Sequence, residues 1–236
     1  MFNLKSQRLF DSVDLTYGSH KRPDDGMCAM EMVAFLAGET HSDHPDCACP
    51  LLTGFTIRLN DSMPHKWRQQ LKPYLPLLIG TRDDHEVARA ELLAWRAVRT
   101  FLPMAMEACH LPERAEAFRT FQGGLDRAAD AAYAAYAALT TSPAGKRAVN
   151  AARMATMATA RTAYSSHCAG AARAPHLGQA IEASDAADVA IAVTRLGDPD
   201  TVWALALETL DEAIAIGAEA RAEARLAAPL RTSVEA

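Results

Sequence analysis

The chain has 236 residues, of which half are hydrophobic and 22% are charged, and its formal charge is −5. This composition is typical of a globular protein, and the net negative charge argues against nucleic acid as a partner. Because no apolar stretch is long enough to span a membrane, charged residues interrupt residues 1–15, and the five cysteines lack the pattern of a secreted disulfide framework, we expect a cytoplasmic protein without a membrane segment.

Helical periodicity starts after an irregular N-terminal arm that is rich in turn formers. Apolar side chains recur at helical spacing over 27–37, and Gly38 is a suitable residue to end that helix. Residues 39–49 show no hydrophobic period and are predicted to form a loop. From Pro50 to about residue 60 we expect a second helix, with a short strand over 55–59 as the alternative.

Proline and glycine divide the next part of the chain into shorter elements. Helices are predicted over 62–71 and from about Asp83 to residue 111, with a short apolar stretch at 75–79 between them. The second of these helices contains Pro103. This proline should kink the helix, because it removes a backbone donor and clashes with the preceding turn.

The composition becomes alanine-rich after Gly123 and Gly124. About four helices are predicted in this part, because alanine has the highest helix propensity. Two of them should start near Ser142-Pro143 and Asp198-Pro199, and turns are expected near Ala169-Gly170 and Gly197.

Together these patterns predict an all-α protein, a multi-helix bundle of about seven to nine helices with an alanine-rich C-terminal half. We divide it into a helical N-terminal region with a Cys/His loop, residues 1–122, and an alanine-rich helical bundle, residues 123–236. One continuous domain is the alternative, because a chain of this length can form either.

Residues with metal-binding side chains are concentrated between Cys28 and Cys49. Thiolate sulfur and imidazole nitrogen are the usual ligands of zinc, and a loop can fold several of them around one ion. The predicted zinc ligands are Cys28, His44, Cys47 and Cys49, with His41 and Glu31 as further candidates. Bound zinc would act as a staple between the first helix and the loop.

The same residues allow two other interpretations. Cys49 precedes the helix that begins at Pro50, and at that position the helix dipole would lower the pKa of its thiol. A nucleophilic or redox cysteine would result, with His44 as base and Cys47 as resolving thiol. Alternatively, the cysteines are small buried apolar residues, and the polar side chains around them only shape turns.

Several short motifs occur together in the first half of the chain. They are Cys28-Ala29-Met30-Glu31, Ala37-Gly38-Glu39, Ser42-Asp43-His44-Pro45, Cys47 and Pro50, followed by Asn60-Asp61 and Gly80-Thr81-Arg82. With these motifs the chain resembles a group of uncharacterised actinobacterial and phage proteins, and the likeness extends loosely to the alanine-rich half. We know of no activity for that group, so the resemblance marks residues that matter without implying a function.

No acidic residue occurs between Asp130 and Glu182, whereas basic residues continue through this segment. On a helical wheel, alanine and threonine fill most of one face. The opposite face carries Lys146, Asn150, Arg153, Met157, Arg161 and Tyr164. This bulky face should point to solvent or to a partner.

Part of the bulky face is a candidate anion site, in which arginine binds phosphate and tyrosine stacks on a base. Its residues are Lys146, Arg153, Arg161 and Tyr164. A phosphate, a nucleotide or a nucleic-acid backbone would fit this chemistry. Alternatively, the acidic segment 182–223 neutralises the basic residues within the fold.

The sequence contains none of the glycine-rich nucleotide loops, metalloprotease helices or nucleophile elbows of common enzyme classes. The leading hypothesis is a non-catalytic helical binding or accessory protein, whose partner is an unknown protein or a second copy of the chain. The alternatives are an enzyme that uses Cys49 and His44 or a bound metal, and a nucleotide or nucleic-acid binder that uses the basic face. The sequence alone does not decide whether the protein is an enzyme.

Overall fold

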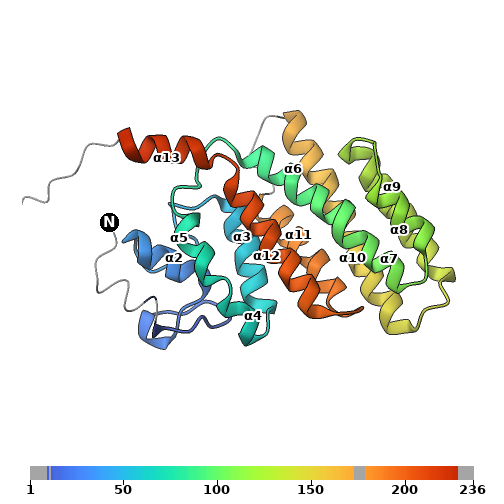
Figure 1. Cartoon of the computed structure of the whole chain (residues 1–236), viewed down its shortest axis with the longest axis horizontal. Helices are drawn as coiled ribbons and strands as arrows, with labels where there is room; N and C mark the ends of the chain where they lie inside the picture. The colour runs from blue at the N-terminus through green and yellow to red at the C-terminus, as the bar shows by residue number, and fades with distance from the viewer. Residues whose placement is uncertain (1–9, 11, 173–178, 228–236) are drawn as a thin grey trace, which may run out of the picture.

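Helices make up nearly all the regular structure of the protein (Figure 1). The computed structural model describes residues 10, 12–172 and 179–227. Over these ranges it contains no strand, and its β-type pairing is limited to an isolated bridge between Leu15 and Met27. The predicted all-α fold is therefore confirmed. Within the same ranges, none of the helices combines the length and the apolar character that crossing a membrane requires.

The first half begins with an arm and a group of short helices at one end of the molecule (Figure 1). Residues 1–9 of the predicted arm lie outside the described ranges. The elements that follow are η1 (Pro23–Asp25), α2 (Ala29–Ala37), α3 (Pro50–Ser62), α4 (His65–Gln69), η2 (Lys72–Tyr74) and α5 (Leu75–Leu78). The alternative strand over 55–59 is wrong, because Leu51, Phe55 and Leu59 bury one face of a helix.

The predicted long helix is present from Glu86 but is interrupted by a wider turn. It consists of α6 (Glu86–Arg96), the π-helical segment η3 (Ala97–Phe101) and α7 (Leu102–Ala108), and α8 (Pro112–Arg119) follows. Pro103 is the second residue of α7. The π-helical turn lies directly before it, where an α-helix would lose a hydrogen bond to the missing proline N–H.

The alanine-rich half forms helices at the other end of the molecule and along its length. They are α9 (Leu125–Ala138), η4 (Leu139–Thr141), α10 (Lys146–Ala172), α11 (Gln179–Val193), α12 (Pro199–Ala215) and α13 (Ala218–Ala227). The expected turn at 169–170 is wrong, because α10 continues through Gly170 to Ala172. A single glycine between alanines costs a helix only about 1 kcal/mol. The turn at Gly197 is confirmed.

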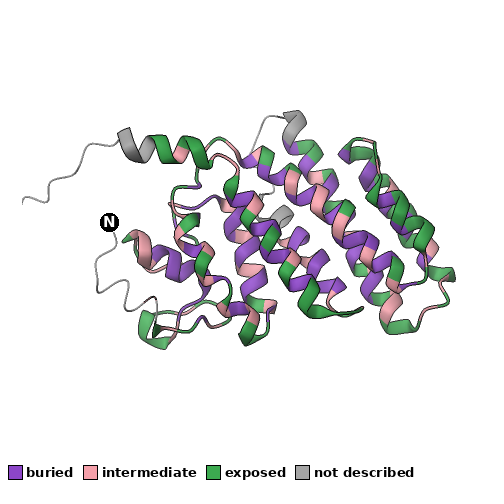
Figure 2. Cartoon of the chain, viewed as in Figure 1, coloured by how far each residue is buried: buried purple, intermediate pink, exposed green. Residues whose placement is uncertain are grey.

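Helices of the two predicted halves share one hydrophobic core, which extends from Leu15 to Ile214. In that core α11 packs against both α3 and α10, and α10 also packs against α6 and α7. Figure 2 shows the buried faces of these helices turned toward one another. This packing joins residues 1–122 to residues 123–236 through shared apolar surface.

The alanine and threonine face of α10 is its buried face, as the helical wheel predicts. Ala152, Ala155 and Ala163 are fully buried. The buried hydroxyls of Thr156 and Thr159 donate to the carbonyls of residues 152 and 155 in the preceding turn, at 2.6 and 2.8 Å. The threonines therefore satisfy their own polar groups, and the small side chains let neighbouring helices approach closely.

Candidate functional site

The carboxylate of Glu31 is the centre of a buried hydrogen-bond network at the start of α2. Its side chain is 1% exposed. Cys28 is the N-cap residue: its backbone N–H donates to Glu31 Oε2 at 2.7 Å, and the N–H of Glu31 donates to Cys28 Sγ at 3.4 Å. This reciprocal arrangement is a capping box, with sulfur in the place of the usual hydroxyl. It fixes the first turn of α2.

Two histidines from different segments contact the same carboxylate. The Nδ1 atom of His20 lies 2.8 Å from Glu31 Oε2, and the backbone N–H of His20 donates to Oε1. His41 Nε2 donates to the carbonyl oxygen of His20 at 2.9 Å and lies 3.6 Å from Glu31 Oε1. One buried carboxylate therefore connects the arm before α2 with the loop after it.

The hydrogen bonds around Glu31 also determine its charge. Burial by itself raises the pKa of this carboxyl group, but the backbone amides of His20 and Cys28 and the His20 side chain outweigh it and lower the pKa below its usual value. Glu31 is therefore ionised at neutral pH. Since its oxygens already accept several hydrogen bonds, the Glu31 carboxylate has a structural role and holds the surrounding segments together.

Other residues of the motifs that carry the resemblance lie around the same arm and loop. Asn60 Oδ1 accepts the N–H of Ala29 at 3.2 Å, and Asn60 Nδ2 donates to the carbonyl of Thr16 at 2.9 Å. Asp61 accepts the N–H of Gly18 at 2.8 Å. Asn60 and Asp61 thus tie the end of α3 to the arm and to the start of α2.

The Gly80-Thr81-Arg82 motif holds the far side of the loop. Gly80 N–H donates to the carbonyl of Cys47 at 2.8 Å, Thr81 Oγ1 accepts the N–H of Cys49 at 2.9 Å, and Arg82 pairs with Asp46 at 2.8 Å. Motif residues that are far apart in sequence therefore meet around one loop. Their shared role in the structure is to fix its conformation.

Two of the predicted zinc ligands are buried at helix starts. Cys28 caps α2, and Cys49 occupies the N-cap position of α3, as predicted, without a capping hydrogen bond from its side chain. Burial raises the pKa of Cys28 to about 12 and also raises that of Cys49, whose Sγ lies 4.0 Å from Glu86 Oε1. A nucleophilic cysteine at a helix N-terminus requires a lowered pKa, whereas the pKa of Cys49 is raised. Loss of water around the thiol raises this pKa more than the backbone N–H donors lower it.

The other two predicted ligands lie on the outer side of the loop. Cys47 is half-buried, and burial together with the neighbouring Glu39 carboxylate raises its pKa to about 11. The His44 side chain is 70% exposed, and its Nδ1 lies 2.8 Å from Asp43 Oδ1. His44 also borders an open hollow on the surface of the loop.

The parts of the chain that the structure describes contain no group of three or more His, Cys, Asp or Glu side chains placed to hold a metal ion. The contacts of Cys28, His44, Cys47 and Cys49 are with different neighbours, and His41 and Glu31 belong to the capping network. Zinc binding by these residues therefore stays a prediction. Elemental analysis of the purified protein, with Cys47→Ser as the comparison, tests it directly.

Sequence reasoning missed Arg89 of α6, which is fully buried. It makes a bidentate pair with Asp83 at 2.7 and 2.8 Å and donates to the carbonyls of Thr81, Ala213 and Ile216. All five of its N–H groups therefore have acceptors. The sequence did contain a signal for its burial: Arg89 stands four residues before Leu93 and so lies on the same, buried face of α6.

The ion pair with Arg89 keeps the carboxyl group of Asp83 ionised. Burial of Asp83 acts to raise its pKa, but the hydrogen bonds from Arg89, from the N–H of His85 and from Arg221 lower it to about 2. Arg221 also donates to the carbonyl of Ile216. This cluster fixes the end of α12 against the segment between α5 and α6.

The structure separates the members of the predicted anion site. Arg161 makes a bidentate pair with Asp185 of α11, at 2.9 and 2.7 Å, and this pairing raises the pKa of Arg161. Arg161 is thus neutralised within the fold, as the alternative interpretation predicted for the basic residues. Arg153 instead lies over the ring of Tyr136 of α9, 5.2 Å from its centroid.

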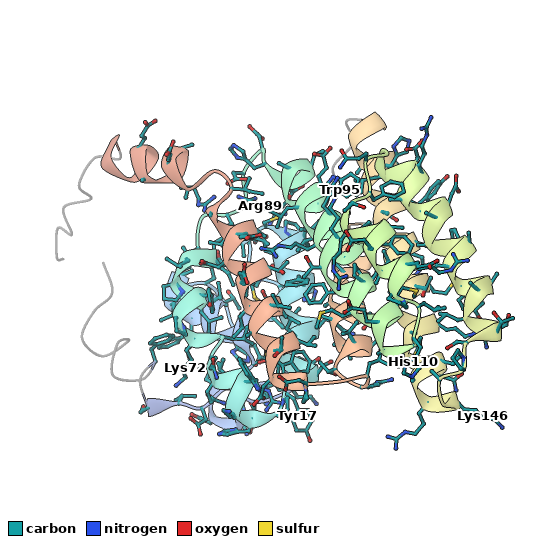
Figure 3. The ribbon with its side chains drawn as sticks, turned by 45° about the vertical axis from the view of Figure 1, so that its right-hand side comes forward. Tyr17, Lys72, Arg89, Trp95, His110 and Lys146 are labelled. Carbon is teal, nitrogen blue, oxygen red and sulfur yellow. The ribbon has the colours of Figure 1, made fainter. Side chains whose placement is uncertain are left out.

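Lys146, Asn150 and Arg153 line a surface hollow between the η4 segment and α10. The Nε atom of Arg153 is buried and has no hydrogen-bond acceptor among the described residues. In Figure 3 Lys146 lies at the edge of the molecule, away from Arg89.

Large exposed side chains gather on the same two helices. Tyr133 and Tyr136 of α9 are 46% and 36% exposed, and Met154 and Tyr164 of α10 are 50% and 59% exposed. Of the face of α10 that the helical wheel predicts to be exposed, Lys146, Asn150, Arg161 and Tyr164 are exposed and Arg153 and Met157 are partly buried. Sequence reasoning missed that α9 adds two tyrosines to this face, because pairing of the helices cannot be read from one helix alone.

Comparisons of the chain with protein families, with curated proteins and with solved structures gave no match.

Proposed function

We propose that this chain is a non-catalytic binding protein that recognises a protein partner through the surface of α9 and α10. This surface, called the α9–α10 face below, consists of Tyr133, Tyr136, Lys146, Arg153, Met154 and Tyr164. The Cys/His loop is a structural element in this proposal. We place the protein in the cytoplasm, because an odd number of cysteines without a disulfide pattern suits a reducing compartment.

The observation that carries the proposal is the concentration of large apolar and aromatic side chains on the α9–α10 face. Of the large hydrophobic residues that are exposed in the described ranges, the other two lie apart from this face: Tyr17 precedes η1 and Leu77 belongs to α5. Tyrosine, methionine and arginine are the residue types enriched at protein interfaces. Exposed apolar groups that cluster in this way mark interaction sites more often than singly scattered ones do.

The chemistry of the thiols supports a non-catalytic role. The pKa values of Cys28, Cys47 and Cys49 are all raised, so these thiols are protonated at neutral pH. A cysteine enzyme at Cys49 predicts faster modification by iodoacetamide than at the exposed Cys168. We expect the reverse order, which peptide mass spectrometry after timed labelling would measure. Preferential labelling of Cys49 would favour the enzyme alternative.

The experiment that tests the proposal is affinity purification from the native cells with two matched variants. Tyr136→Ser with Tyr164→Ser alters the α9–α10 face, whereas Tyr17→Ser with Leu77→Ser removes comparable exposed side chains elsewhere. We expect the first variant to lose a specific partner that the wild type and the control retain.

The partner identified by mass spectrometry is then purified and titrated against the three proteins. Equal affinity for all three would contradict the use of this face. A partner that is a second copy of the chain would appear as concentration-dependent mass in analytical ultracentrifugation, and that association should also be lost in the first variant.

A further inference from the structure

The basic residues in the first half of α10 differ from most other arginines of the protein in having no carboxylate partner. Ion pairs within the described ranges neutralise Arg22, Arg58, Arg82, Arg89, Arg96, Arg119, Arg161 and Arg221. No described carboxylate lies within ion-pair distance of Lys146, Arg147 or Arg153. The fold therefore leaves this short basic stretch uncompensated.

The hollow beside Lys146 offers hydrogen-bond donors in excess of acceptors. Its lining, as far as the structure describes it, contains no carboxylate. The hydroxyls of Thr140 and Ser142 on its wall already donate to the carbonyls of Ala137 and Cys109, at 2.7 and 2.8 Å.

The donors that remain are the ammonium group of Lys146, the amide of Asn150 and the guanidinium of Arg153. The last includes the buried Nε atom without an acceptor. Because Nε is closed off from solvent, the groups that an acceptor from outside can meet in the hollow are the ammonium group of Lys146, the amide of Asn150 and the rest of the Arg153 guanidinium.

We infer that this hollow binds carboxylates of an acidic segment of the partner protein, which continues over Tyr136 and Met154. This inference rests on the proposed function and adds the chemical class of the partner, a protein with an acidic segment. Carboxylates are the acceptors that match a guanidinium fork and an ammonium group. The neighbouring tyrosine and methionine would cover the apolar parts of such a segment.

The extent of the basic stretch favours an acidic protein segment over nucleic acid. On α10 itself the uncompensated cations are confined to the first turns, and Arg195, which donates to Met154 Sδ at 3.6 Å, adds a further cation beside them. Further along the helix, Arg161 is paired with Asp185, and Asp188 of α11 lies close enough to add to the rise in its pKa. A polymer with regularly spaced phosphates would meet these carboxylates, whereas a short acidic segment needs only the hollow and its rim.

The test measures fluorescence anisotropy of a labelled oligo-glutamate peptide at low salt, with an oligothymidylate of the same length as the second probe. Lys146→Ala with Arg153→Gln removes the two cations of the hollow. Lys21→Ala with Arg114→Gln makes the same change of charge at two exposed positions outside the hollow, where the described part of the chain likewise provides no carboxylate partner. We expect the first variant to bind the peptide about tenfold more weakly and the control to bind like the wild type.

Each other outcome overturns the inference. If both variants bind the peptide equally more weakly than the wild type, binding depends only on the net charge of the protein. If the wild type does not bind the peptide at low salt, the hollow does not bind carboxylates. Tighter binding of the oligothymidylate, lost in the first variant, would assign the site to nucleic acid. Self-association that only Lys146→Ala with Arg153→Gln abolishes would assign the hollow to a second copy of the chain.

The purified partner separates this inference from the proposed function. If the partner is lost from Tyr136→Ser with Tyr164→Ser but retained by Lys146→Ala with Arg153→Gln, the face binds a protein and the inference about its acidic segment fails. If neither variant loses the partner, the proposed function fails as well.

Discussion

The region around the loop and the α9–α10 face lie toward opposite ends of the molecule (Figure 1). Polar side chains around the loop bond to one another, whereas cations of the α9–α10 face have no carboxylate partner among the described residues. Around the loop, Glu31 accepts hydrogen bonds from the capping residue and from His20, and each N–H of Arg89 has an acceptor. On α10, Lys146 and Arg153 find no carboxylate among the described residues, and large side chains near them are exposed.

This difference separates residues that stabilise the fold from residues that are available for binding. Polar groups that satisfy one another inside a protein have no capacity left for a ligand, and removing one of them leaves its partners unpaired. Unpaired groups on the surface have the opposite properties, because removing them changes binding and leaves the fold intact. Unfolding measurements on variants of both regions can test this contrast.

The largest effect is expected for Arg89→Met. This change leaves buried carbonyl oxygens without donors and removes the principal partner of Asp83, so the free energy of unfolding should fall by about 3–5 kcal/mol. Urea denaturation at neutral pH, followed by circular dichroism, measures it. The matched control is Arg114→Met on the exposed side of α8, which should change stability by less than about 0.5 kcal/mol. Similar values for the two variants would contradict a central role for Arg89.

Glu31→Gln should have the next largest effect, a loss of about 2 kcal/mol at neutral pH. The amide keeps the shape of the side chain but replaces one of its two acceptor oxygens by an NH₂ group, which then meets the N–H of either His20 or Cys28. Glu91→Gln, an exposed substitution on α6, is the control. Comparable stability of the two variants would mean that the capping network contributes little.

The effect of Glu31→Gln should also depend on pH. The folded-state pKa of Glu31 is lowered, so its contribution is fully present above the pKa of the unfolded state, about 4.3, and is lost as pH falls through the folded-state value. The difference in stability between wild type and Glu31→Gln should therefore shrink in acid. A difference that grows as the pH falls would reverse the sign and contradict the lowered pKa.

A smaller effect is expected from the ion pair between Arg161 and Asp185. Its geometry is bidentate and Asp185 is largely buried, but the side chain of Arg161 is 47% exposed, so water weakens the interaction. A double-mutant cycle with Arg161→Ala and Asp185→Asn should give a coupling energy of about 1 kcal/mol. High salt should reduce it. Zero coupling would place Arg161 among the residues available for binding.

The region that stabilises the fold, around the loop, could be partly predicted from the sequence. Periodic apolar residues gave α2 and α3 their correct positions, and Gly38 ends α2 in a left-handed conformation at φ 76°. Local chemistry also identified Cys49 as the residue at the N-cap position of α3. These features depend on neighbours within one or two turns, which a single sequence displays directly.

Long-range contacts account for what the sequence did not reveal. His20 meets Glu31 across η1, and Arg89 bonds to carbonyls of α12 more than a hundred residues away. The grouping of cysteines and histidines in the chain suggested a shared ligand set, yet Cys49 and Thr81 share a hydrogen bond while His44 faces solvent. Proximity along the chain did not predict which side chains point toward each other.

The smallest effect on stability should come from Lys146→Ala with Arg153→Gln. Within the described ranges Lys146 has no carboxylate to lose, and the partly exposed contact between Arg153 and Tyr136 is worth about 0.5–1 kcal/mol. Urea denaturation should therefore find this variant nearly as stable as the wild type, although its affinity for acidic probes should fall. A loss as large as that of Glu31→Gln would show that these cations hold the fold together, and the contrast between the two regions would disappear.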